Sequence, residues 1–99
     1  MDIMTISLGE KIKKEKEKYG TLGNTYEMFP VGTRVQVITL GQDMIFFNGN
    51  EIGTVIRNSG NYLGIIVKFD EEYQKHYKSG YIMEEFNFKP EDLIILKYG

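Results

Sequence analysis

The sequence predicts a mainly β domain in which five short strands close into a small barrel, preceded by one short α-helix. Two observations lead to this expectation. The first part of the chain is rich in lysine and glutamate with helix start and stop signals, whereas from Arg34 onward apolar residues alternate with polar ones, as in half-buried strands. A chain of 99 residues can bury one modest core. We therefore expect a charged helical extension over residues 1–24 and one β-barrel domain over residues 25–99.

The expected helix covers "SLGEKIKKEKEKYG", residues 7–20. Ser7 and Glu10 have the spacing of a capping box, in which each side chain accepts a hydrogen bond from a backbone N–H at the start of a helix. Gly20 is placed to take the left-handed conformation that ends one. The apolar face is thin, so we expect a solvated helix with one lightly docked edge. Residues 21–32 then form a linker.

The alternating pattern predicts strands at residues 34–40, 51–58, 62–70, 81–89 and 93–97. "SGN" at 59–61 predicts a tight hairpin, and "PED" at 90–92 a single 3₁₀ turn. Residues 41–50 are expected to form a long loop and residues 71–80 a polar connection. A long first loop, a tight hairpin and a helical turn before the last strand describe an SH3-like small barrel.

Gly53 stands among β-branched residues in "NEIGTV", residues 50–55. In the expected register Gly53 and Val55 point inward. A glycine there lets the strand bend and lets a neighbouring backbone come close, as barrel corners require. In the third strand we expect Leu63, together with Ile65, Val67 and Phe69, on one apolar face.

The framework residues also resemble a known family. The stretches are "VGTRVQV" (31–37), "FN" (47–48), "NEIGTV" (50–55), "IVKFD" (66–70) and "FNF" (86–88). They resemble the SH3-like electron-transport accessory proteins of photosystem I over about residues 31–96, and more loosely the KOW-type modules of ribosomal and transcription proteins. The first resemblance implies a non-catalytic accessory protein that docks an acidic electron carrier through basic residues, Lys68 among them. The chain departs from that family in its acidic barrel and its charged helix, so we use the resemblance as evidence of fold.

Composition excludes several chemistries. The chain has no cysteine, which excludes disulfides, thiolate catalysis and Cys-ligated metals, and a cytoplasmic protein is expected. Residues 1–24 carry five lysines against four acidic residues, and residues 25–99 carry seven basic against ten acidic residues. An acidic barrel repels phosphate backbones. There is no apolar run of the roughly 20 residues that span a bilayer, and the N-terminus is a poor signal peptide.

No catalytic, cofactor or metal site is predicted. His76 is the single histidine, and neither a nucleophile nor a third orienting group can be placed beside it. The carboxylates of "DEE" (70–72) and "PED" (90–92) lack the spacing of a calcium loop. The glycines form no nucleotide-binding motif. We expect a protein without enzymatic activity and without a cofactor.

Aromatic residues gather in the two long connections. Phe46 and Phe47 are adjacent in the first, and Tyr73, Tyr77 and Tyr81 line the second; in one interpretation the two loops flank a ligand groove. In the other, a phenylalanine plugs the barrel and the tyrosines pack on the helix. The predicted partner-binding set is Phe46, Phe47, Lys68, Tyr73, Lys75, Tyr77 and Tyr81.

The leading hypothesis is a non-catalytic protein-interaction module, that is, an accessory protein, adaptor or inhibitor, that binds a protein through its aromatic loops and acidic face. Small size and high lysine, asparagine, isoleucine and tyrosine content would suit a phage-encoded protein. The alternative is a KOW-like nucleic-acid-binding protein that uses Lys75, Lys78, Tyr77 and the lysine-rich helix. The helix is too short for a sustained heptad seam, so self-association would favour a barrel edge over a coiled coil.

Overall fold

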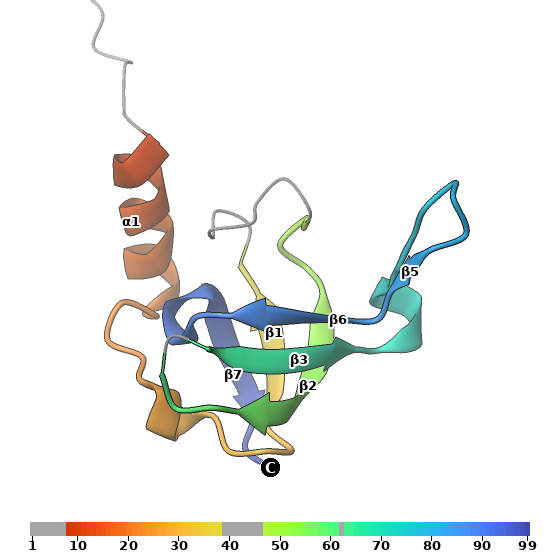
Figure 1. Ribbon diagram of the computed structural model, residues 1–99. Helices are drawn as coiled ribbons and strands as arrows, with labels where there is room; N and C mark the ends of the chain where they lie inside the picture. Colours follow the sequence, from red (N-terminus) through yellow and green to blue (C-terminus); the bar gives the residue numbers. More distant parts are fainter. Residues whose placement is uncertain (1–7, 39–46, 62) are drawn as a thin grey trace, which may run out of the picture.

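The computed structural model describes residues 8–38, 47–61 and 63–99. Ser7 and Phe46 therefore lie outside the described residues. The elements, in chain order, are α1 (Leu8–Tyr19), η1 (Tyr26–Met28), β1 (Arg34–Val37), β2 (Ile52–Asn58), β3 (Ile65–Phe69), η2 (Glu71–Tyr73), β4 (Lys75–His76), β5 (Ile82–Met83), β6 (Glu85–Phe88), η3 (Pro90–Asp92) and β7 (Leu93–Lys97), as Figure 1 shows.

Five strands form one antiparallel sheet in the order β6-β3-β2-β1-β7, and β4 and β5 form a separate two-stranded sheet. The expectation of a mainly β chain with one short N-terminal helix is confirmed. Within the described residues the edge strands β6 and β7 do not pair with each other, so the sheet is open. The core lies on one face of this sheet, because inward residues alternate with outward ones along β1 and β2. Its buried members are Phe29, Val35, Val37, Phe47, Val55, Ile65, Val67, Phe69, Met83, Phe88 and Leu93.

Gly53 lies where β2 packs most closely on β3. It is buried and pairs with Phe69, as Val55 pairs with Val67. A Cβ atom built on Gly53 would collide with the carbonyl oxygen of Lys68 and lie 2.7 Å from Cγ1 of Val67. The predicted close approach of a neighbouring backbone is confirmed. The irregularity in the β2–β3 ladder lies further along, between Val55 and Arg57.

The third strand begins later than predicted, and the inward assignment of Leu63 is wrong. Asn58 pairs with Ile65, so the described residues 59–61, 63 and 64 lie in the loop between the two strands. Gly60 and Gly64 adopt positive φ angles of 72° and 85°, which strand residues do not have. Leu63 is consequently 54% exposed.

The predicted strand at 81–89 is two strands, β5 and β6, and the predicted connection at 71–80 contains η2 and β4. Strand β4 pairs with β5 through Lys75 with Met83 and His76 with Ile82. Alternation over two residues is too short to recognise in a sequence. The last two predicted elements, the turn over 90–92 and the strand over 93–97, are confirmed.

Helix α1 ends as predicted and is fixed at that end. Gly20 has a φ of 71°. The N–H of Thr21 donates to the carbonyl of Lys16 at 2.8 Å and that of Gly20 to Glu17 at 3.1 Å, which is a Schellman motif. Nζ of Lys16 lies 3.0 Å from Oε1 of Glu91 in η3. The helix stands beside the sheet (Figure 1).

Candidate functional site

The β4–β5 hairpin, which we call the arm (residues 75–83), projects from the body of the sheet (Figure 1). Its strands pair over two residues each, and the N–H of Tyr77 donates to the carbonyl of Tyr81 at 2.9 Å to close the turn. Met83 is buried in the core and fixes one strand at its base. The arm is thus held at its base by core packing, while its tip is exposed.

The other strand of the arm is fixed by an ion pair with a buried carboxylate. Oε2 of Glu51 lies 2.7 Å from Nζ of Lys75, and the Glu51 side chain is 1% exposed. The same carboxylate accepts hydrogen bonds from three consecutive backbone N–H groups, those of Asn48 at 2.8 Å, Gly49 at 3.0 Å and Asn50 at 3.2 Å. One side chain therefore joins the turn at 48–50 to the arm.

The environment keeps Glu51 ionised. Burial raises its pKa, but the hydrogen bonds from Lys75 and from backbone N–H groups outweigh burial, so the pKa of Glu51 lies below its ordinary value. The sequence patterns did not predict this residue as part of any site. A glutamate directly after "NGN" is the available signal, because a carboxylate there can accept the free N–H groups of the turn.

Two tyrosines form the exposed part of the arm. Side chains alternate between the two faces of a two-stranded ribbon. Tyr77 and Tyr81 therefore lie on the same face as Lys75 and Met83, two residues further along each strand toward the tip of the arm. Their rings are 5.7 Å apart at an angle of 31°. They are 41% and 60% exposed, and Ile82, on the opposite face, is 39% exposed. We call Tyr77 and Tyr81 the tyrosine pair.

The remaining aromatic candidates are divided between core and surface. Phe47 is 4% exposed and its ring centroid lies 5.1 to 5.5 Å from those of Phe69, Phe86 and Phe88. Tyr73 is half-buried against the same core. The sequence left two interpretations open, and the position of Phe47 agrees with the one in which a phenylalanine is packed inside. The tyrosine pair agrees with neither interpretation, because it is exposed on the arm.

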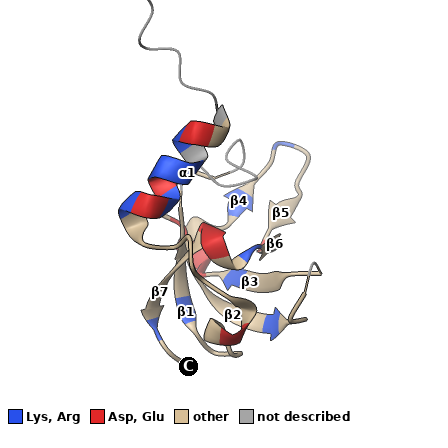
Figure 2. Ribbon diagram, turned by 90° about the vertical axis from the view of Figure 1, so that its left-hand side faces the viewer, with Lys and Arg blue, Asp and Glu red and all other residues tan. Residues whose placement is uncertain are grey.

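The basic candidates are also divided. Lys75 is paired with Glu51, whereas Lys78 is exposed at the tip of the arm. Lys68, the basic position of the family resemblance, is exposed on β3, opposite Glu85 of β6. Along α1 lysines and glutamates alternate, as Figure 2 shows. The structure brings Tyr77, Lys78 and Tyr81 together and leaves Lys68 on the sheet.

Acidic residues surround the base of the arm. Glu71 and Glu72 precede β4, Glu84 and Glu85 follow β5, and all four are exposed. The two segments are neighbours, because the N–H of Phe69 donates to the carbonyl of Glu84 at 2.9 Å. We call these four glutamates the acidic base.

Asp70, the first carboxylate of "DEE", has a structural contact instead. Its two carboxylate oxygens accept hydrogen bonds from both terminal nitrogens of Arg34 at 2.6 Å. The hydrogen bonds from Arg34 hold the pKa of Asp70 below its ordinary value. This bidentate pair joins the end of β3 to β1.

Asp92 in η3 differs from Asp70, because its carboxylate is buried and its pKa is raised rather than lowered. Its side chain is 4% exposed, and Oδ1 lies 3.5 Å from Nζ of Lys16 without a hydrogen bond. Burial raises the pKa of Asp92, although the nearby charge of Lys16 opposes the rise.

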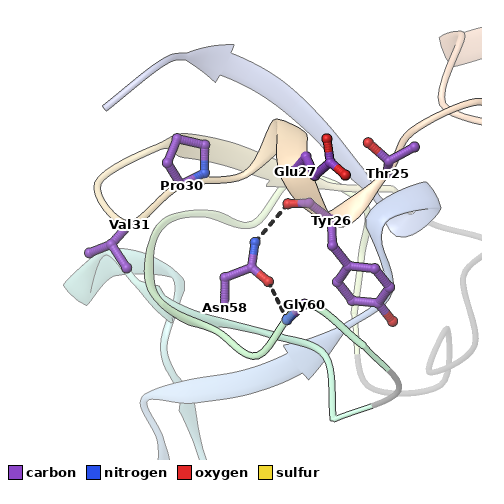
Figure 3. Close-up of a pocket in the computed structure, with 7 residues that line it drawn as sticks. All are labelled: Thr25, Tyr26, Glu27, Pro30, Val31, Asn58 and Gly60. Atoms are coloured by element: carbon purple, nitrogen blue, oxygen red, sulfur yellow. Dashed lines mark hydrogen bonds between the residues drawn. The ribbon is translucent and has the colours of Figure 1, made fainter.

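A shallow hollow of about 520 Å³ lies between η1, the linker that follows it and the end of β2 (Figure 3). It is lined by Thr25, Tyr26, Glu27, Pro30, Val31, Asn58 and Gly60. Nδ2 of Asn58 donates to the carbonyls of Tyr26 at 2.7 Å and Phe29 at 2.8 Å, and so fixes the linker across β2. A second hollow, of about 360 Å³, shares Thr25 and Tyr26 with the first. The sequence did not predict either hollow.

Metal clusters and membrane spans are other features that could indicate a function. Within residues 8–38, 47–61 and 63–99, no three His, Cys, Asp or Glu side chains gather as metal ligands would. In the same part of the chain, no helix has the length and apolar character needed to cross a membrane. In the comparisons with known proteins, no family model, curated protein or solved structure matches the chain.

Proposed function

We propose that the protein is a non-catalytic interaction module that binds a protein partner through the arm. The observation that carries this proposal is the tyrosine pair, two large rings exposed side by side on a projecting hairpin. Tyrosine is enriched in protein interfaces, because it offers a large rigid contact area at low entropic cost. The leading expectation from the sequence is thereby narrowed from two aromatic loops to one arm.

The construction of the arm supports this proposal. A two-stranded hairpin is marginally stable in water on its own, so a projecting one gains from packing against another surface. Its base is fixed by Met83 in the core and by the ion pair of Lys75 with Glu51. A fixed base holds the tyrosine pair in place before binding, which lowers the entropy lost on association.

The acidic base adds a charge preference. Glu71, Glu72, Glu84 and Glu85 are exposed, and none has an ion pair with another described residue. Partners with a basic rim are therefore favoured during encounter, and the association rate should fall as salt is added.

The test is affinity capture from the cells that make the protein, with the full chain as bait. The double variant Tyr77→Ala/Tyr81→Ala is compared with wild type. Tyr19→Ala is the matched control, since Tyr19 is 42% exposed at the end of α1, away from the arm. A protein captured by wild type and by the control, and lost with the double variant, supports the proposal. Identical captures by all three baits would contradict it.

Nucleic-acid binding is the second candidate. It is favoured by the position of Lys78 beside the tyrosine pair, because exposed aromatic rings can stack on bases and a lysine can contact phosphate. Against it, Lys75 is paired with Glu51 and the acidic base lies close by. Nuclease treatment before capture separates the two candidates. Retention of a labelled oligonucleotide at low salt, reduced by Lys78→Ala, would favour this candidate.

We also propose that the chain is an SH3-like small barrel. The strand order β6-β3-β2-β1-β7, the ladder irregularity in β2 and the 3₁₀ turn before β7 support this description. Backbone dynamics and long-range contacts measured by NMR would test whether β6 and β7 approach closely enough to close it. The resemblance to the photosystem I accessory proteins remains a prediction about this fold.

A further inference from the structure

Strand β6 is an edge strand of the five-stranded sheet and pairs only with β3. The N–H of Phe69 donates to the carbonyl of Glu84 opposite it, which fixes the alternation of hydrogen bonds along this ladder. Every second residue from Glu84 therefore directs its main-chain groups toward β3, whereas Glu85 and Asn87 direct theirs away from it. In the described part of the chain no hydrogen bond reaches these outward main-chain groups of Glu85 and Asn87.

Strand β7, at the opposite edge of the sheet, has two features that hinder pairing with a further strand. The N–H of Ile38 donates to the carbonyl of Asp92, so the main-chain groups of Leu93 point away from β1. Nδ2 of Asn24 donates to the carbonyl of Leu93 at 3.0 Å and covers that position. The β1–β7 ladder is also irregular beside Arg34, and bulges disturb the pairing of an edge. The β3–β6 ladder, in contrast, keeps one register along its length.

The side chains of β6 differ between the two faces of the sheet. Glu85 and Asn87 are exposed on the outer face, opposite Lys68 and Ile66 of β3. Phe86 is half-buried on the inner face, against the core. A strand that pairs with this edge would place alternate side chains beside Glu85 and beside Phe86. Basic residues on one face and apolar residues on the other would complement them.

We propose that β6 accepts an extended segment of the partner as a further antiparallel strand, with basic residues beside Glu85 and apolar residues beside Phe86. Unpaired main-chain groups at alternate residues are the pattern that an extended strand complements. In this mode of recognition the main-chain hydrogen bonds supply affinity, and the alternate side chains supply specificity. The charge of Glu85 restricts the edge to strands that carry a complementary charge.

This inference deepens the proposed function and rests on it, because the edge begins where the arm ends. Strand β5 ends at Met83 and β6 begins at Glu85, and Figure 1 shows the arm rising beside the start of β6. The acidic base, which includes Glu84 and Glu85, lies at this junction and favours the approach of a basic segment. A partner strand on β6 would thus lead directly to the tyrosine pair.

The experiment is an NMR titration of the full chain with an acetylated peptide of about ten residues, alternating lysine and valine, the latter a residue favoured in strands. We expect saturable shifts of the Glu85 and Asn87 N–H signals and slower hydrogen exchange at both. A lysine opposite Glu85 would exchange both main-chain hydrogen bonds with it. Methylation of the main-chain nitrogen of every lysine should therefore abolish binding. Methylation of every valine nitrogen, on the other edge of the peptide, is the matched control and should preserve it.

Substitutions in β6 test the same contacts from the protein side. Glu85→Pro removes an outward N–H and no donor of the β3–β6 ladder, so it should raise the dissociation constant about tenfold. Glu85→Gln keeps the N–H and removes the charge, and a rise of about threefold is expected. Glu17→Gln, at an exposed glutamate of α1, is the control and should leave the constant unchanged. Far-UV circular dichroism checks folding, and the methylated peptides give the answer with the wild-type chain.

Equal affinity of the two methylated peptides, or shifts confined to other strands, would overturn the inference. The capture experiment decides the proposed function separately. Loss of a partner with Tyr77→Ala/Tyr81→Ala, when no peptide binds β6, would overturn the added strand and leave the arm as the binding site. A peptide bound at β6, when all baits capture alike, would support the added strand and contradict only the role of the arm.

Discussion

Lys75 and Glu51 join two parts of the chain that lie far apart in the sequence, with Nζ of Lys75 lying 2.7 Å from the buried carboxylate. Glu51 also closes the turn at residues 48–50 through three backbone N–H groups. The position of the arm therefore depends on a carboxylate that is distant from it in the sequence. Removing one partner of a buried ion pair destabilises the fold much more than replacing both partners with apolar residues of similar volume.

Glu51→Gln should accordingly lower the free energy of unfolding by about 3 kcal/mol, because it removes the partner of Lys75 and leaves that charge part-buried. Urea unfolding at neutral pH measures the loss. Glu85→Gln, an exposed glutamate of the acidic base, is the control and should change stability by less than about 0.5 kcal/mol. Equal effects of the two substitutions would show that the Glu51 contacts contribute little.

Gly53→Ala should lower the free energy of unfolding by about 2 kcal/mol or more, and Gly53→Val should prevent folding. The added Cβ atom would collide with the carbonyl oxygen of Lys68, and neither backbone can move without disturbing the β2–β3 ladder. Gly23→Ala is the matched control, because nothing lies within 4 Å of a Cβ atom there. Thermal unfolding distinguishes the two; a Gly53→Ala variant as stable as Gly23→Ala would contradict the close approach.

Phe47→Ala should lower the free energy of unfolding by about 3 to 5 kcal/mol, because it empties the space among three aromatic rings. Tyr81→Ala should change stability by less than about 0.5 kcal/mol, because its ring is 60% exposed. The pair of variants separates a residue that stabilises the core from one in the proposed binding surface. Urea unfolding of both variants is the measurement, and a stable Phe47→Ala variant would refute the packed position.

Asp70→Asn and Asp92→Asn should have opposite effects on the pH dependence of stability. The pKa of Asp70 is lowered by Arg34, so the folded state loses stability as pH falls through that pKa, below the ordinary value of 3.8. The pKa of Asp92 is raised by burial, so the wild type loses stability as pH rises from 3.8 through the raised pKa.

Urea unfolding of the two variants at a series of pH values measures these effects. Asp70→Asn should be less stable than wild type at neutral pH and equal to it in strong acid. Asp92→Asn should be more stable than wild type at neutral pH, since Lys16 keeps Glu91 as a partner 3.0 Å away. A neutral-pH loss of stability in Asp92→Asn would show that the contact with Lys16 outweighs the cost of burial.

Short-range patterns in the sequence were enough to predict the structural elements that depend only on neighbouring residues. The end of α1 at Gly20, the 3₁₀ turn at 90–92, the last strand at 93–97 and the inward position of Gly53 follow from turn chemistry and from alternation over several residues. Composition also excluded thiolate chemistry, because the chain has no cysteine.

Tertiary structure decided which of the candidate residues are exposed. Phe47 and Tyr77 are both aromatic residues in connections between the predicted strands, yet one is buried among phenylalanines and the other stands on the arm. Likewise Lys75 and Lys78 lie in the same short segment, and only contact with Glu51 separates a structural lysine from an exposed one. The physical reason is that burial and ion pairing depend on residues distant in the chain, which the alternation of neighbouring residues does not encode.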